Sequence, residues 1–324
     1  MDNIIKLLGV AIGGTKSAVT FGTFTDGKLI ALNKTVVKTD PNDPDVTFGR
    51  IFDAIDQLKF GFDYIGIICG GPLDIKRGLI NTPPNLPGFK AIPVCKMFTD
   101  RYNKPSILLN DADACAYAEW RFGAGVGVDN IIYLTCGTGF GAGLILNGDL
   151  FSGTIGQAGE IGHVRLDNFG GPGYGKVGSA EGFLSGSGIA KTAIAFATEY
   201  IQRGEYTSLC STFDEAYKIT AKDVAVHAKN GDACAKKVFD VTAQKLGDVL
   251  AILVDLFNPD RIVIGGVYQR NEDLLYDKAV ARMREEALPV NAACVKILPS
   301  FLKEEIDDYS SLSAAVYAYK KYSK

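Results

Sequence analysis

The chain has 324 residues, of which 47% are hydrophobic and 22% charged, and its formal net charge is −3. This length allows two domains with cores of their own, or one large domain. The slightly acidic balance argues against a nucleic-acid-binding surface, which needs a basic stripe. The longest apolar runs, such as residues 249–254, are far shorter than the ~20 residues of a membrane-spanning helix. We therefore expect neither nucleic acid nor a membrane among the partners.

The cysteines number seven and form no CxxC pair. Such cysteines are typical of small buried hydrophobic side chains in a reducing compartment. The first residues lack the charged and then apolar segments of a secretory leader. The sequence therefore predicts a cytoplasmic protein.

Short β-rich runs alternate with turns in the first forty residues, as "KLLGVAI", "SAVTFGTF" and "KLIALNKTVV". They predict a three-stranded meander whose first turn is rich in glycine. The pattern then predicts a helix over residues 46–58 and strands over 64–69 and 105–110. An alanine-rich helix, "DADACAYAEWRFG", follows the last of these strands directly.

The second half repeats this theme. Residues 130–153 again predict a strand, a glycine-rich turn and a strand, and residues 153–186 predict glycine-rich, site-forming loops. Further on, the spacing predicts a helix over 233–257, a strand over 261–266 and a last helix over about 310–322. Two halves that each open on a hairpin with a glycine-rich tip suggest a duplication, with the binding cleft between them.

Two glycine-threonine turns are candidate phosphate-binding loops: "GGTK" at residues 13–16 and "CGTGFG" at 136–141. Glycines let a ligand approach the backbone, so that successive N–H groups point at an anion. The first turn alone fits a plain hairpin, and it lacks the spacing of a P-loop. Two such tips on two hairpins, however, are what a nucleotide held between two domains requires.

Asp111 follows a buried strand and opens a helix. A helix N-cap is the ordinary role of such an aspartate. The alternative is a carboxylate that accepts the proton of a substrate hydroxyl during phosphoryl transfer. A second polar set is "GEIGH", where Glu160 and His163 stand among glycines and suit a polyhydroxylated ligand. The other histidine, His227, has no such company, and we expect a structural role for it.

Six motifs, "GGTK", "NLPGF", "NDADA", "LTCGTGFGAGLI", "GEIGH" and "IVIGG", occur in an order and spacing that resemble the ROK family (repressor, open reading frame, kinase) over essentially the whole chain. The resemblance implies an α/β fold of the actin-like, hexokinase type (ribonuclease H-like), with the active site in the cleft between two domains. The expected domains are a smaller one, residues 1–111 plus about 308–324, and a larger one, residues 112–307. Because ROK kinases are often dimers, a homodimer is also expected.

The resemblance implies that Asp111 is the general base acting on the 6-hydroxyl of a hexose. The residues that it implies around the sugar are Gly71, Asn85, Asn110, Asp111, Glu160, His163 and Glu181. The residues that it implies for the phosphates and adenosine of ATP are Gly13, Gly14, Thr15, Lys16, Gly137, Thr138, Gly139, Gly265 and Gly266. ATP and Mg²⁺ are the implied cofactors.

The chain departs from the family pattern at a zinc site and at a magnesium site. Pro172, Tyr174 and Ser179 stand where many members have three cysteines, so we expect no zinc and a His163 that serves the sugar alone. Ala11 stands where the family usually has an aspartate that helps position Mg²⁺. A methyl group cannot bind a hard cation, and the loss of one charge-stabilising contact can cost ~10²–10³ in rate.

The sequence therefore predicts an ATP-dependent hexose kinase, with glucose as the default substrate and fructose, mannose or N-acetylhexosamines as alternatives. A second hypothesis is a sugar-binding sensor of the same family with weak catalysis, which Ala11 favours and Asp111 opposes. Because the first phosphate loop comes so early in the chain, we expect this sensor to lack a DNA-binding domain. An actin-like filament or chaperone ATPase would explain the phosphate loops but not "GEIGH" or Glu181.

Overall fold

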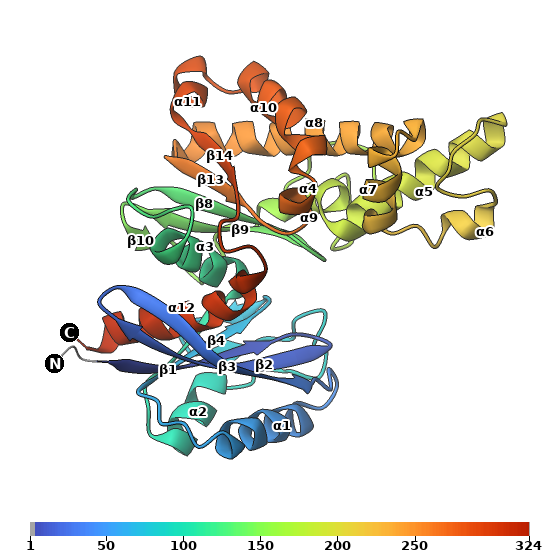
Figure 1. Cartoon of the computed structure of the whole chain (residues 1–324). Helices are drawn as coiled ribbons and strands as arrows, with labels where there is room; N and C mark the ends of the chain where they lie inside the picture. Colours follow the sequence, from blue (N-terminus) through green and yellow to red (C-terminus); the bar gives the residue numbers. More distant parts are fainter. Residues whose placement is uncertain (1–3, 324) are drawn as a thin grey trace. The chain divides into compact units, whose positions relative to one another are not determined.

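The computed structural model describes residues 4–323 and has the α/β architecture expected from the sequence (Figure 1). Contacts between Cα atoms divide the chain into two compact units. The first comprises residues 1–128, 143–158 and 301–324, and the second comprises 129–142 and 159–300. The domain boundaries expected from the sequence stay a prediction, and they differ from these units at residues 112–128, 143–158 and 301–307.

The sheet of the first unit has the strand order β3-β2-β1-β4-β7. Its strands are β1 (Ile5–Ile12), β2 (Lys16–Thr25), β3 (Lys28–Lys38), β4 (Tyr64–Cys69) and β7 (Ser106–Asn110). The first three form the predicted antiparallel meander, whereas β4 and β7 are added in parallel to β1. A short pair, β5 (Leu73–Asp74) and β6 (Leu79–Ile80), lies outside this sheet.

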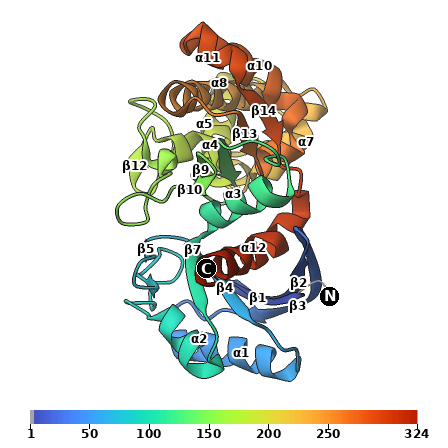
Figure 2. The ribbon, with the colours of Figure 1, turned by 90° about the vertical axis from the view of Figure 1, so that its left-hand side faces the viewer.

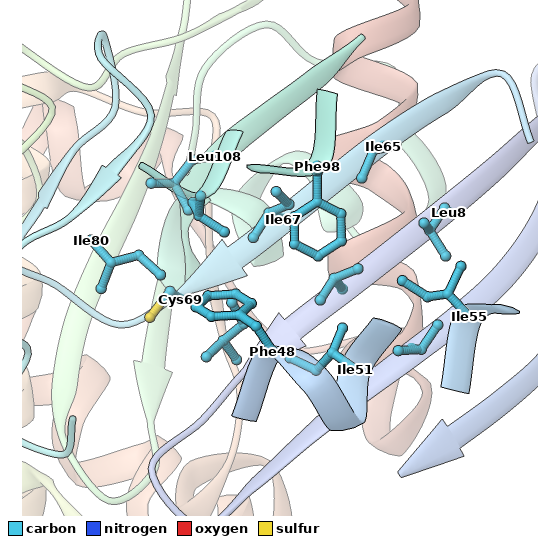
Figure 3. Packing of buried hydrophobic residues seen from close by; sticks show 14 of the residues in the cluster. Leu8, Phe48, Ile51, Ile55, Ile65, Ile67, Cys69, Ile80, Phe98 and Leu108 are labelled. Carbon is cyan, nitrogen blue, oxygen red and sulfur yellow. The ribbon is translucent and has the colours of Figure 1, made fainter. Parts of the chain in front are cut away.

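Helices cover both faces of this sheet. Figures 1 and 2 show α1 (Pro44–Gln57) and α2 (Val94–Tyr102) on one face and α12 (Ile306–Tyr322) on the other. Beneath α1 and α2 lies a core in which Phe48 and Phe98 pack with aliphatic side chains of the strands (Figure 3). On the opposite face α12 approaches closely, since a Cβ added to Gly66 would lie 2.2 Å from the backbone nitrogen of Ala315.

The sheet of the second unit has the order β10-β9-β8-β13-β14. Its strands are β8 (Ile131–Cys136), β9 (Phe140–Leu146), β10 (Asp149–Leu150), β13 (Arg261–Ile264) and β14 (Lys296–Pro299). As in the first sheet, two antiparallel hairpins are followed by two parallel strands on the other side of the first strand. The repeated strand order agrees with the two related halves predicted from the sequence.

The longest helix, α8 (Ala233–Phe257), has the bounds that its apolar spacing predicts. The last helix, α12, begins at Ile306, earlier than the expected residue 310, and β13 ends at Ile264, before the paired glycines. The residue pattern did not predict α5 (Gly186–Arg203) or α10 (Glu272–Glu286). The remaining helices are α3 (Asp111–Phe122), α6 (Phe213–Ala216), α7 (Ala221–Lys229), α9 (Val267–Arg270), α11 (Pro289–Cys294) and η2 (Lys303–Glu305).

The glycine-rich segment 153–186 is not loop throughout. It contains the short elements η1 (Ile161–His163), β11 (Pro172–Gly173), β12 (Lys176–Val177) and α4 (Ala180–Leu184). These pieces are too short to show a hydrophobic period, which is why the sequence did not predict them. Among residues 4–323, the helices are all too short or too polar to cross a membrane.

Candidate functional site

Three parallel strands of the first unit end side by side. Ile12 of β1 pairs with Cys69 of β4, and Cys69 pairs with Asn110 of β7. The next residues along the chain are Gly13, Gly70 and Asp111. Ligands of open α/β sheets bind outside the carboxyl ends of such strands. The register therefore gathers the first glycine-threonine turn, the Gly70-Gly71 pair and Asp111 at the binding edge of this sheet.

Asp111 is the first residue of α3 and not its N-cap. The cap is Asn110, whose side-chain oxygen accepts a hydrogen bond of 2.9 Å from the Ala112 N–H. One Asp111 oxygen, Oδ1, accepts from the same N–H at 2.8 Å, and Oδ2 lies 3.8 Å from where a Cβ on Gly70 would be. The N-cap interpretation of Asp111 is thus wrong, because Asn110 fills that role.

Asp111 keeps a solvent-exposed surface, although the protein groups near its carboxyl partly desolvate it. This desolvation raises the pKa of the carboxyl above its ordinary value, and the hydrogen bonds from the Ala112 and Asp111 N–H groups oppose the rise. A carboxylate with a raised pKa is a stronger proton acceptor. The electrostatics therefore suit a general base.

The "GGTK" turn joins β1 to β2. Within it the Gly13 N–H donates to the Lys16 carbonyl at 3.2 Å, and the Thr15 carbonyl accepts from the Thr39 N–H at 3.1 Å. The side chains of Thr15 and Lys16 are exposed. A Cβ on Gly14 would lie 2.7 Å from the Cβ of Asn85, so the turn lies directly against "NLPGF". The structure thus brings Asn85 to the phosphate turn.

Ala11 lies half-buried near the end of β1. Its methyl group packs against a small apolar cluster formed by Ile68, Leu109, Ala114 and Ala314. No oxygen ligand is offered at this position by an alanine side chain. Position 11 is therefore part of the hydrophobic packing of the first unit.

The second glycine-threonine turn connects β8 to β9 in the second unit. Its Gly137 N–H donates to the Gly139 carbonyl at 3.0 Å, and its Gly137 carbonyl accepts from the Gly186 N–H at the start of α5 at 2.8 Å. Gly266, which follows β13, has a φ of +70°. A Cβ there would lie 2.0 Å from the Cys136 carbonyl oxygen. Only glycine fits this approach, which places Gly265-Gly266 against the turn.

A pocket of about 820 Å³ opens beside this turn, a size typical of small-molecule sites. Aliphatic side chains from α5, α7 and α9 form much of its wall, and Lys222, Lys229 and Arg270 supply positive charge. Its lining residues are Gly137, Thr138, Gly186, Ser187, Ala190, Ile219, Thr220, Ala221, Lys222, Ala225, Val226, Lys229, Val267, Arg270 and Asn271. Apolar walls and cations together suit a base attached to phosphates.

Sequence reasoning found only the glycine turn of this pocket. The local pattern gave no sign of α5, and it assigned only a structural role to His227 of α7. One usable signal was the run "SGSG" at residues 185–188, in which Ser185 caps α5 through the Gly188 N–H at 3.0 Å. The spacing of Lys222, Val226 and Lys229 on one helical face was another.

The polar residues predicted for the sugar in the second unit lie together. Gly162, inside "GEIGH", is so close to β9 that a Cβ there would lie 1.9 Å from the Phe140 carbonyl oxygen and 3.6 Å from the Cβ of Glu181. Glu181 Oε2 accepts from the Phe140 N–H at 3.2 Å. Glu160 immediately precedes η1, and His163 ends it with an exposed side chain. Glu181 thus links the phosphate turn to the segment that carries Glu160 and His163.

The positions that depart from the zinc pattern have protein partners. Ser179 caps α4 by accepting from the Gly182 N–H at 3.3 Å, and the Tyr174 ring packs on the His163 ring. Proline has no side-chain donor atom at position 172. Among residues 4–323, the structure contains no cluster of three or more His, Cys, Asp and Glu residues that suits a metal ion.

Comparisons with known proteins agree with this architecture. A glucokinase of Halalkalibacterium halodurans is 34% identical over 292 residues, which cover 87% of this chain and 86% of the relative. The crystal structure of a ROK family glucokinase from Streptomyces griseus, in complex with glucose and AMPPNP, superposes with a TM-score of 0.74 at 28% identity. It covers 98% of this chain and 100% of that one. The likeness confirms the predicted hexokinase-type fold.

A regulator of the same family is also similar. The crystal structure of a ROK family transcriptional regulator, a homologue of the Escherichia coli Mlc protein, superposes with a TM-score of 0.84 at 25% identity, covering 97% of this chain and 78% of that one. The model of the ROK family matches residues 7–320. The chain belongs to the ROK family.

Proposed function

We propose that this chain transfers the γ-phosphoryl group of ATP to the 6-hydroxyl of a hexose, with Asp111 as the general base. The chain is a sugar kinase of the ROK family. The observation that carries the finer proposal is the register of the first sheet. It brings Asp111 and the Gly13–Lys16 turn to the same edge of the sheet, on either side of β4, which supports a base and a phosphate-binding backbone in one site.

Asp111 accepts the proton of the attacking hydroxyl as the phosphoryl group is transferred. Its raised pKa brings its basicity nearer to neutral pH, which favours proton transfer at working pH. Asn110 is left with its side-chain NH₂ for the sugar, because its oxygen caps α3. Asn85 and Gly71 from the same unit, and Glu160, His163 and Glu181 from the second, contact the remaining hydroxyls in this proposal.

ATP binds through the second unit in this proposal. The pocket walls of Ile219, Val226 and Val267 take the base, and the cations of Lys222 and Arg270 attract the phosphates. The exposed Thr15 and Lys16 of the first turn and Thr138 and Gly139 of the second turn receive the β- and γ-phosphates through N–H groups. In this proposal the γ-phosphoryl group is transferred to the sugar hydroxyl from which Asp111 accepts the proton.

Mg²⁺ fits this site only with the help of the nucleotide. Position 11 offers a methyl group in an apolar cluster, whereas Asp111 offers one carboxylate. Mg²⁺ is commonly held by one or two carboxylates together with substrate phosphates and water, so Asp111 and ATP could complete a ligand set. When bound, the ion neutralises phosphate charge.

Glucose is the proposed sugar, because the similar Halalkalibacterium and Streptomyces proteins are glucokinases. Fructose, mannose and N-acetylhexosamines share the hydroxyls that carboxylate and imidazole groups recognise, and they are the alternative substrates. We further propose a cytoplasmic location, a homodimer, and action on small molecules without nucleic acid. The seven cysteines, which are free thiols in the structure, support a reducing compartment.

The second candidate is a sugar-binding sensor with weak catalysis. The packing of Ala11 in an apolar cluster favours it, because a magnesium-positioning carboxylate is replaced by hydrophobic contact. The resemblance to a ROK transcriptional regulator is compatible with it. Asp111 opposes it, because binding alone needs no proton acceptor.

An assay of ADP release with Mg·ATP and a panel of hexoses and N-acetylhexosamines separates the two functions. A kinase gives saturable, sugar-dependent turnover that Asp111→Ala abolishes, and the panel identifies the substrate. A flat trace for every sugar, with sugar binding still visible by calorimetry, would support the sensor. Turnover that survives Asp111→Ala would overturn the proposed base.

A further inference from the structure

Tyr174 adopts a backbone conformation that bulky residues avoid. It forms the two-residue tip of the β11-β12 hairpin with Gly175, and their φ angles are +43° and +74°. Hairpin tips with two positive φ angles favour Asn-Gly or Gly-Gly, and a tyrosine there stores strain. Strain of this kind persists where surrounding contacts hold it, and it clusters at functional sites.

The strained tip brings an aromatic ring to His163. The centroids of the Tyr174 and His163 rings are 5.7 Å apart, and their planes meet at 73°, an edge-to-face arrangement. Tyr174 is 67% exposed, so its ring is not needed to fill the core. The strained backbone at Tyr174 therefore serves to hold its ring against His163.

Two lysines fasten this hairpin and the histidine to the rest of the second unit. Lys176, in β12, donates to the His163 carbonyl at 2.8 Å. Lys191, in α5, donates to the Pro172 carbonyl at 2.7 Å. Figure 2 shows the loop around β12 standing out from the helices of this unit. A hairpin that projects in this way depends on the Lys176 and Lys191 hydrogen bonds for its position.

The residues present do not suit a metal ion that would hold the β11-β12 hairpin against His163. Proline at position 172 has no donor atom, and the Ser179 hydroxyl is engaged, donating to the Gly173 carbonyl at 3.4 Å and accepting from the Gly182 N–H. Zinc sites need three or four thiolate, imidazole or carboxylate ligands, and among residues 4–323 no three such side chains gather into a cluster that suits a metal ion. These positions have protein partners instead: Ser179 bonds to Gly173 and Gly182, Tyr174 contacts His163, and the Pro172 carbonyl accepts from Lys191.

We propose that Tyr174 is a positioning residue for the His163 imidazole, and that Lys176 and Lys191 hold it in place without a metal. Edge-to-face contact fixes the plane of the imidazole, and the two lysine bonds fix the backbone on either side of the pair. The consequence for the sugar rests on the proposed function, in which His163 contacts a sugar hydroxyl. A ring displaced by about 1 Å can cost ~10²-fold in a positioned reaction.

The first test reads the histidine directly and needs no activity. The chain has two histidines, so a spectrum of histidine-labelled protein contains one reporter signal and one internal control, His227. Tyr174→Gly should shift the His163 signal and leave that of His227 in place, whereas Tyr174→Phe, which keeps the ring, should shift neither. Dialysis against a chelator should leave both signals unchanged. An unmoved His163 signal in Tyr174→Gly, or one that moves with the chelator, overturns the proposal.

The second test separates positioning from stability. Glycine relieves the positive φ at position 174, so Tyr174→Gly should unfold no earlier than the wild type while its KM for the sugar rises about tenfold or more. Tyr174→Phe should retain the wild-type KM. Lys191→Met should raise the KM for the sugar, whereas Lys191→Arg, which keeps a donor for the Pro172 carbonyl, should retain the wild-type KM. Lys236→Met, which changes an exposed lysine of α8, serves as the control. An unchanged KM in Tyr174→Gly, beside the expected spectral shift, would refute the sugar role of His163 and leave the positioning itself intact.

Discussion

At the scale of single residues, the charged carboxylate of Asp111 lowers the free energy of unfolding at neutral pH. Its carboxyl pKa is raised in the folded chain above the ordinary 3.8, mainly by desolvation. A group with a raised folded pKa favours folding fully at pH below its unfolded pKa, and this contribution is lost as the pH rises through the folded pKa. At neutral pH the charged Asp111 therefore destabilises the protein relative to a neutral side chain.

Asp111→Asn should consequently unfold at a higher temperature than the wild type at pH 7. Asparagine keeps an oxygen that accepts from the Ala112 N–H, so the local structure is retained. The difference should shrink as the pH falls through the raised pKa of the folded state and vanish below the ordinary 3.8, where the aspartate is neutral in both states. Turnover should fall by ~10²–10⁴. Thermal unfolding at several pH values measures the first effect, and a variant less stable than the wild type at pH 7 would contradict it.

Ala11→Asp introduces a carboxylate against Ile68, Ala114 and Ala314. Because this position is half-buried and apolar, we expect a loss of unfolding free energy on the order of 1–3 kcal/mol. Urea unfolding measures it, and Ala11→Ser, a small uncharged change, is the control. A stable Ala11→Asp variant with faster turnover would show that the wild-type site lacks a magnesium ligand that the fold still accommodates.

At the scale of elements, the approach of Gly266 to the Cys136 carbonyl joins β13 to the phosphate turn. Gly266→Ala should weaken nucleotide binding, because a Cβ would push the Gly137 turn away while straining a φ of +70°. Gly204→Ala is the matched control, since Gly204 has a φ of +68° and no atom within 4 Å of an added Cβ. Calorimetry with AMPPNP compares the two. Equal AMPPNP affinities of the two variants would show that the close approach of Gly266 to Cys136 does not contribute to nucleotide binding.

The sequence predicted long, strongly periodic elements well. In α8, apolar residues recur with helical spacing, and its predicted bounds of 233–257 match the structure. The meander and both glycine turns also followed from local patterns. By contrast, α5 begins with Gly-Ser-Gly, which favours turns, and it is helical because Ser185 caps it and because Ala193 and Ala197 are buried. The nucleotide pocket was missed with it, since three separate helices form its wall.

The motifs predicted which residues belong to the candidate site, but they did not predict every helix cap and side-chain contact in it. They placed Asp111 at a helix start, yet the cap is Asn110, because its extended backbone lets the side chain reach the Ala112 N–H. They gave no sign that Tyr174 touches His163, since the contact depends on a strained turn eleven residues further along the chain. Local strain and close approach are properties of folded geometry and not of spacing.

At the scale of the whole molecule, the proposed sugar ligands are shared between the two units. Asn85, Asn110 and Asp111 belong to the first unit, and Glu160, His163 and Glu181 to the second. A hexose that hydrogen-bonds to both sets requires donor–acceptor distances of about 3 Å on each side. Sugar binding should therefore draw the units together and exclude water from the γ-phosphate.

Small-angle scattering with and without the sugar tests this coupling. We expect a smaller radius of gyration with the sugar, and thermal stabilisation of about 2.7 kcal/mol at a free sugar concentration of ~100 Kd. His163→Ala should weaken the compaction, because one of the contacts from the second unit is lost, whereas His227→Ala should leave it unchanged. Sugar binding without compaction would mean that one unit holds the sugar alone. The division of the ligands between the two sheets would then be wrong, while the general base at Asp111 would still stand.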